Sequence, residues 1–239
     1  MLTLSLAIIA GHNLLDGLHF APESALHVPW AILHDRGWIE VGDSLRLRTS
    51  YPLLPWIGVI GLGYALGPWF ARGADALSRQ QGLLLGGIAG LLGFVGLRLI
   101  NAYGEKPWAV EDTTVQTLMA FFNITKYPPS LLFITLTVSI GLLLLLAFER
   151  LQTRRWIRWL TVFGSAPMFF YLLHLYVLKV LYVIAVALFG LNQGSYFGFD
   201  SVPTIWLVSL LLALTLYPAV RWFSALKSRR RDIAWLKYL

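Results

Sequence analysis

The polar segment Asn123-Ile-Thr-Lys-Tyr-Pro-Pro-Ser130 lies directly before an unbroken apolar run from Leu131 to Ala147. Proline suits the first turn of a helix, where the backbone amides have no partners, and it holds the residue before it out of the helical conformation. The entrance to this helix is therefore expected to be stiff, polar and basic. Lys126, Tyr127 and Asn123 are candidate substrate-binding residues for an anionic or hydroxylated ligand. The alternative is an interfacial anchor, because lysine and tyrosine commonly lie at bilayer edges.

A second polar group lies near the start of the chain, in Gly11-His-Asn-Leu-Leu-Asp-Gly17. If the helix continues through it, His12 and Asp16 are four residues apart and share one face. A carboxylate beside an imidazole fixes the tautomer and raises the pKa of the ring, which suits a general base. His12 and Asp16 are thus candidate catalytic residues, and Asn13 is a candidate substrate ligand. The same pattern also fits an ordinary helix end, with Gly17 after the last turn.

His174 lies inside a long apolar stretch, three residues after Tyr171 and on the same predicted helix face. An imidazole at membrane depth can act as a base, a proton relay or a hydrogen-bond donor, so His174 is a third catalytic candidate. The alternative is a neutral histidine that a neighbouring helix satisfies. Lys179 and Arg98, in or near predicted spans, are interpreted as interfacial cations.

The chain has no cysteine, which excludes disulfides, thiolate catalysis and thiolate metal sites. Three further histidines, His19, His27 and His34, follow the first polar group in the sequence. Their spacing matches no strong metal-binding template, so we predict no metal site.

The composition is that of an integral membrane protein, because 57% of the 239 residues are hydrophobic and only 13% are charged. Length favours helices over strands for its apolar segments. We expect an all-α polytopic helical bundle that forms a single transmembrane domain over residues 1–239. Its five full spans are predicted near residues 53–70, 82–100, 131–147, 160–189 and 204–223, with a partial N-terminal span at 1–15.

The loops between these spans alternate in charge, as the positive-inside rule requires. Arginines and lysines gather in loops 72–81 and 149–159 and in the C-terminal tail, which are therefore predicted to be cytoplasmic. Loops 16–52, 101–130 and 190–203 hold nine of the twelve acidic residues and are predicted to face outward. The net charge of +7 thus reports membrane orientation and does not indicate nucleic-acid binding. Within loop 16–52, a small hairpin is expected, with its turn at Gly42-Asp-Ser.

With these residues described, the chain resembles bacterial relatives of heparan-alpha-glucosaminide N-acetyltransferase, a transmembrane acyltransferase superfamily long classed as a domain of unknown function. The resemblance extends over positions 10 to 174, and its most specific element is the Lys-Tyr-Pro-Pro sequence. The matching segments are Ala10-Gly-His-Asn-Leu-Leu-Asp16, Tyr51-Pro-Leu-Leu-Pro-Trp-Ile-Gly58, Leu62-Gly-Tyr64, Thr125-Lys-Tyr-Pro-Pro-Ser-Leu131 and Phe169-Phe-Tyr-Leu-Leu-His174.

The resemblance implies an enzyme of the bacterial inner membrane that takes acetyl from cytoplasmic acetyl-CoA, its co-substrate, and delivers it to a sugar or glycan outside the cytoplasm. No bound cofactor is implied. The catalytic histidine of the family belongs to helices that would precede Met1, so we expect an N-terminally shortened chain that is inactive alone. No residue here matches that histidine, and His174, His12 and Asp16 stay candidates on their own chemistry.

Two other function classes stay open at this point. A proton-coupled transporter or flippase-like protein would use His174 and Lys179 as a proton relay. A non-catalytic membrane subunit would bind neither CoA nor sugar.

Overall fold

A computed structural model describes residues 1–41, 45–230 and 232–238 and is 68% helical. Five of its helices are long and apolar enough to cross a membrane, which fits an all-α membrane protein. The chain divides into two compact units, Met1–Glu149 and Arg150–Leu239, which are described separately.

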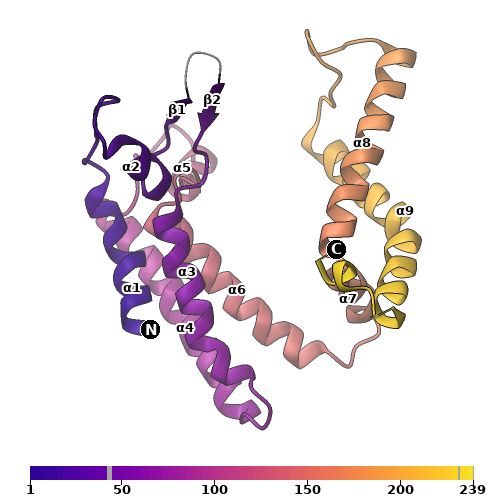
Figure 1. Ribbon diagram of the computed structural model, residues 1–239, viewed down its shortest axis with the longest axis horizontal. Coiled ribbons are helices and arrows are strands. Elements are labelled where there is room, and N and C mark those ends of the chain that lie inside the picture. The colour runs from indigo at the N-terminus through magenta and orange to yellow at the C-terminus, as the bar shows by residue number, and fades with distance from the viewer. Residues whose placement is uncertain (42–44, 231, 239) are drawn as a thin grey trace. The chain divides into compact units, whose positions relative to one another are not determined.

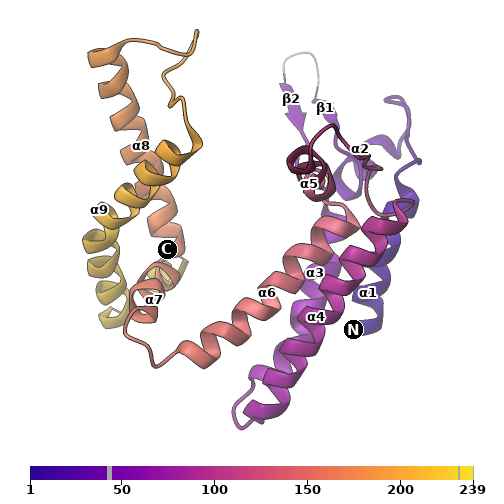
Figure 2. The same ribbon diagram turned by 180° about the vertical axis from the view of Figure 1, so that it is seen from behind.

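The first unit contains four helices that run beside one another, α1, α3, α4 and the first part of α6, together with shorter elements near one of its ends (Figures 1 and 2). Its elements are α1 (Leu2–Gly11), η1 (His12–Leu15), α2 (His27–Leu33), β1 (Trp38–Val41), β2 (Leu45–Arg48), α3 (Leu53–Leu66), η2 (Gly67–Phe70), α4 (Ala76–Ile100), α5 (Thr114–Phe122) and α6 (Leu131–Leu151).

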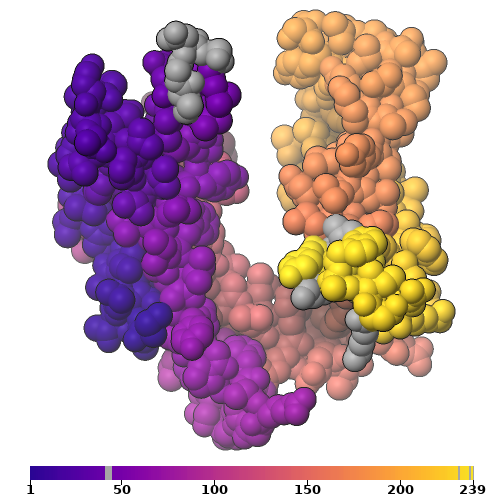
Figure 3. Space-filling model, in the orientation of Figure 1, coloured from indigo at the N-terminus to yellow at the C-terminus, as the bar shows by residue number. Residues whose placement is uncertain are grey.

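Glycines allow two pairs of these helices to approach closely, as small residues do in membrane proteins. A Cβ atom on Gly58 of α3 would lie 2.8 Å from Ile9 Cγ1 of α1, and the surfaces of α1 and α3 lie directly against each other in Figure 3. Likewise, a Cβ atom on Gly87 of α4 would lie 2.6 Å from Leu143 of α6, and one on Gly90 would overlap the Ser139 hydroxyl. The close contacts fix α1 against α3 and α4 against α6.

The short helix α5 packs against α4 through aromatic rings and one buried arginine. Phe94 is fully buried and stacks on Phe122, with 6.1 Å between ring centroids. Arg98, only 2% exposed, donates hydrogen bonds to the carbonyls of Phe121, Ala120, Asn123 and Lys106. The expected interfacial cation is therefore a buried residue that binds the C-terminal carbonyls of α5.

The predicted hairpin is present as the antiparallel pair β1 and β2, with Trp38 opposite Arg48. Its two arms are joined beyond the sheet by the Thr49 side chain, whose hydroxyl is bonded to the backbone of Gly37. The expected turn at Gly42-Asp-Ser lies outside the described residues.

The second unit consists of α7 (Ile157–Ser165), α8 (Pro167–Phe189), α9 (Val202–Arg229) and η3 (Ala234–Tyr238). Phe169 of α8 stacks face to face on Phe223 of α9 at 4.1 Å, beside a buried cluster that includes Ala166 and Val220. That residues 1–239 form a single transmembrane domain stays a prediction.

The predicted span 160–189 is wrong in one respect, because the helix is broken at Ala166. This residue has φ −139° and ψ 56°, outside the helical region, and Pro167 begins the next helix. The ring of a proline clashes with a helical conformation at the residue before it, which accounts for the break. Other helices exceed their predicted bounds: α4 begins at Ala76 after the Asp75 cap, and α9 runs from Val202 to Arg229.

Candidate substrate-binding site

A polar cavity of about 380 Å³ lies in the first unit, where α1 ends and α6 begins. Three of the predicted site residues, Asn13, Asp16 and Tyr127, line it. The rest of its wall comes from the segments before α5 and α6: Ala102, Tyr103, Gly104, Glu105, Lys106, Thr125, Pro128 and Ser130.

The Lys-Tyr-Pro-Pro sequence forms a turn beside this cavity and is not part of the helix. Lys126 pairs with Pro129 in an isolated bridge, and α6 begins only at Leu131. The expectation that both prolines occupy its first turn is therefore wrong. Side chains and loop carbonyls cap the helix instead: Leu131 N donates to Asn13 Oδ1 at 2.8 Å, and Phe133 N donates to Ser130 Oγ at 3.0 Å.

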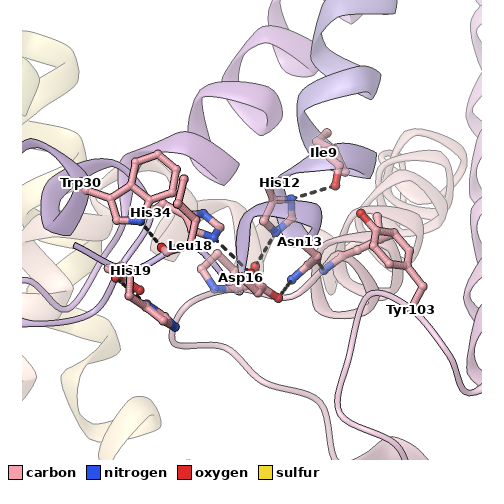
Figure 4. A network of polar contacts seen from close by, with 12 residues as sticks. Ile9, His12, Asn13, Asp16, Leu18, His19, Trp30, His34 and Tyr103 are labelled. Carbon is pink, nitrogen blue, oxygen red and sulfur yellow. Dashed lines mark hydrogen bonds and ion pairs between the residues drawn. The ribbon is translucent and has the colours of Figure 1, made fainter. Parts of the chain in front are cut away.

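Asp16 is held by Asn13 and His34, and the expected pairing with His12 is wrong (Figure 4). The physical reason is the 3₁₀ turn over His12–Leu15, because residues three apart are aligned in such a turn and residues four apart are not. Asn13 Nδ2 accordingly donates to Asp16 Oδ2 at 2.8 Å, while His34 Nε2 lies 3.1 Å from Asp16 Oδ1. Asp16 keeps 52% of its side chain exposed.

His12 is buried between two carbonyl groups. Its Nδ1 lies 2.9 Å from the Ile9 carbonyl oxygen, and its Nε2 lies 2.9 Å from the Pro129 carbonyl oxygen. The ring thus connects the end of α1 to the turn before α6. Only 2% of His12 is exposed, and it does not line the cavity.

His34 is a site residue that sequence reasoning missed. It ends α2, its side chain is 3% exposed, and Nδ1 has no hydrogen-bond partner among the described residues. Since an ionised carboxylate only accepts hydrogen bonds, Nε2 of His34 carries the hydrogen atom and donates the bond to Asp16. Asp16 and His34 are eighteen positions apart in the chain, and the sequence does not predict this contact, because it depends on how α2 folds back against η1.

Glu105 is the second missed residue. Its carboxylate accepts hydrogen bonds from the Thr125 amide and hydroxyl, the Ser130 hydroxyl and the Lys106 amide. Burial raises the pKa of the Glu105 carboxyl, but these hydrogen bonds together outweigh burial, so the pKa lies below its ordinary value. Because its oxygens are occupied, Glu105 joins the loops around the cavity, and Asp16 is the carboxylate with room for a ligand.

Tyr127 lies at the edge of the cavity, with its hydroxyl 2.9 Å from that of Tyr51. The hydrogen bond with Tyr51 lowers the pKa of the Tyr127 hydroxyl, and Lys126 adds to this effect. The cationic groups of Lys126 and Arg36 lie 5.2 and 5.7 Å from the centre of the Tyr127 ring. Asn123 caps the end of α5, and neither it nor Lys126 lines the cavity.

His174 belongs to the second unit, where it is half-buried on α8. Its Nδ1 lies 3.1 Å from the Phe170 carbonyl oxygen, one turn earlier in the same helix, and its ring stacks on the Phe170 ring at 5.4 Å. The Lys179 ammonium group lies 5.5 Å from the ring centre of Tyr182. These contacts of His174 are therefore within α8.

Comparison of the chain with protein-family models, with curated proteins and with solved structures finds no match in any of the three.

Proposed function

We propose that this protein is a membrane acyltransferase-like protein whose polar cavity binds the acyl acceptor, a sugar or glycan outside the cytoplasm. The donor in this proposal is cytoplasmic acetyl-CoA, as the family resemblance implies. The observation that carries the proposal is the position of Asp16, a half-exposed carboxylate held in a polar cavity by His34 and Asn13.

The chemistry of the cavity supports an acceptor with hydroxyl or amino groups. Asp16 accepts hydrogen bonds, the Tyr103 hydroxyl can accept them while it donates to the Ala10 carbonyl, the Tyr127 hydroxyl donates or accepts, and the Lys106 ammonium group donates. In the proposed transfer, the acceptor oxygen or nitrogen forms a bond to the acetyl carbon, the C–S bond of acetyl-CoA breaks, and CoA leaves as the thiolate. Asp16 binds the acceptor oxygen or nitrogen and accepts the proton that it loses. His34 acts as a positioning residue, because its ring fixes Asp16 and faces away from bulk water.

The charge pattern supports the orientation in this proposal. The cavity lies between loops 16–52 and 101–130, which are acidic, so we place it on the outer side of the bacterial inner membrane. The same pattern puts the C-terminus in the cytoplasm.

Binding of methyl glucosaminide to the full chain in lipid nanodiscs tests the proposal. Asp16→Asn removes the negative charge but keeps the shape of the side chain, and we expect it to weaken binding by about tenfold or more, the effect of losing one charge-assisted hydrogen bond. Asp112→Asn, in an exposed part of the same group of acidic loops, is the matched control and should bind normally.

Transfer is measured in the same preparation with radiolabelled acetyl-CoA. Label in the sugar supports an acyltransferase. Uptake of sugar into sealed proteoliposomes, driven by a pH gradient and without labelling, favours the transporter class. If the native chain and Asp16→Asn bind methyl glucosaminide equally, or neither binds it, the cavity is not the acceptor site.

A further inference from the structure

A second cavity of about 300 Å³ lies among the long helices of the first unit, and its wall is almost wholly apolar. Leu2, Leu6 and Ile9 of α1 line one side, and Ile134, Val138 and Leu142 of α6 line another. Three glycines of α4, at positions 82, 86 and 90, also line it. The volume is about twice that of an apolar cavity of ~150 Å³ that binds benzene.

The hydroxyl groups in this wall are already satisfied. Thr135 Oγ1 donates to the Leu131 carbonyl at 2.8 Å, and Ser139 Oγ donates to the Thr135 carbonyl at 2.6 Å. Both side chains bond back to their own helix, as serine and threonine do in apolar surroundings. The apolar cavity therefore offers hydrocarbon contact alone and suits an alkyl chain rather than water or a sugar.

The two cavities lie one after the other along both α1 and α6. Leu2, Leu6 and Ile9 of α1 line the apolar cavity, and Asn13 and Asp16, in and just after the 3₁₀ turn that follows α1, line the polar one. Ser130, the residue before α6, lines the polar cavity, and Ile134 to Leu142 of α6 line the apolar one. That stretch of α6 is about 12 Å long, close to the ~15 Å depth of one bilayer leaflet.

We infer that the acceptor is a membrane amphiphile, with its sugar in the polar cavity and its alkyl chain in the apolar cavity. This inference rests on the proposed function and narrows its substrate to lipid-linked sugars. Ile9 and Leu131 belong to one buried apolar cluster, and Tyr103 packs against it. The Tyr103 hydroxyl donates to the Ala10 carbonyl at the exposed edge. In the complex, the chain passes along this exposed side of Tyr103.

Photo-crosslinking tests the inference with an alkyl glucosaminide that carries a diazirine near the end of its chain. With the native protein in nanodiscs, we expect crosslinks on Leu6, Val138 and Leu142, and we expect excess methyl glucosaminide to suppress them. Leu6→Trp fills the apolar cavity and should reduce these crosslinks by about tenfold. This is the loss of affinity expected when about two methylenes of the alkyl chain are excluded from the cavity. Leu4→Trp, on the same helix but outside the wall of the apolar cavity, is the control that should leave them unchanged.

Binding of methyl glucosaminide to the native protein distinguishes failure of this inference from failure of the proposed function. Its binding to Leu6→Trp shows that this variant is folded. If it binds and the crosslinks are spread over lipid-facing residues such as Val183 and Leu188 of α8, the chain lies in bulk lipid and the inference is wrong. If Leu6→Trp and the native protein crosslink equally, the inference is also wrong. If methyl glucosaminide does not bind to the native protein, the proposed function fails first.

Discussion

Asp16 and Glu105 both lie in the wall of the polar cavity, but their oxygens have different partners. Glu105 accepts four hydrogen bonds from loop residues on both sides of α5, and the Asp16 carboxylate is held by one amide and one imidazole. A carboxylate saturated by its own protein stabilises the fold, whereas one that is half-exposed can bind a ligand. The two residues should therefore respond differently to the same substitution.

Glu105→Gln is expected to loosen the segments 101–106 and 125–131 by about 1–3 kcal/mol at pH 7, because a charged acceptor of four hydrogen bonds becomes a neutral amide. The folded pKa of Glu105 lies below the unfolded value, so its stabilisation is complete above about pH 4.5 and is lost as the pH falls through the folded pKa. Hydrogen exchange of these segments, corrected for intrinsic rates, should show this loss in the native protein and not in Glu105→Gln. Equal protection of the two proteins at pH 7 would contradict the assignment.

His34→Phe keeps a ring of similar size but removes the hydrogen bond to Asp16. Because Nδ1 of His34 has no partner among the described residues, the substitution leaves no new buried polar group there. We expect the affinity for methyl glucosaminide to fall by up to about tenfold with little change in melting temperature. His27→Phe, in the first turn of the same short helix, is the control, and an equal loss of affinity in both variants would show that the effect is structural.

At the scale of the elements, the close approach of α4 to α6 depends on Gly90. Gly90→Ala places a methyl group on the Ser139 hydroxyl and should cost about 1–3 kcal/mol. Gly90→Ala combined with Ser139→Ala should recover most of this, since Ser139 Cβ lies 3.2 Å from the added atom. Gly93→Ala has nothing within 4 Å and is the control. Thermal unfolding of the purified proteins measures the effect, and a Gly90→Ala protein as stable as Gly93→Ala would contradict this packing.

The helices could be predicted from the sequence, but several of their contacts could not. Length and hydrophobicity locate the long helices, since each must contain about 20 apolar residues to cross a bilayer. Asp16 is predicted as a site residue from its spacing to His12, and Asn13 as an amide ligand beside them, so both residues are predicted although the partner of Asp16 is not. The sequence does not mark Glu105 or His34 as site residues, because charged and polar residues are ordinary in the segments between long apolar runs. Their partners are 18 to 25 residues away in the chain, and only the tertiary structure brings them together.

At the scale of the whole molecule, the predicted orientation can be tested directly, because the chain contains no cysteine. Single variants Asp112→Cys, Gln152→Cys and Ala234→Cys place one thiol in each of three loops or tails. With a maleimide that cannot cross membranes, we expect labelling of Asp112→Cys in intact spheroplasts and labelling of the other two only after lysis. Labelling of Gln152→Cys or Ala234→Cys in intact spheroplasts would reverse the topology and place the polar cavity on the cytoplasmic side.

The two contacts of the buried His12 ring depend on which of its nitrogens carries the hydrogen atom. A neutral ring has one N–H group and can donate to one of the two carbonyl oxygens that lie 2.9 Å away, which leaves the other without a donor from the ring. The tautomer of this buried ring therefore decides whether its N–H group bonds to the end of α1, at Ile9, or to the turn before α6, at Pro129, 117 residues later in the chain.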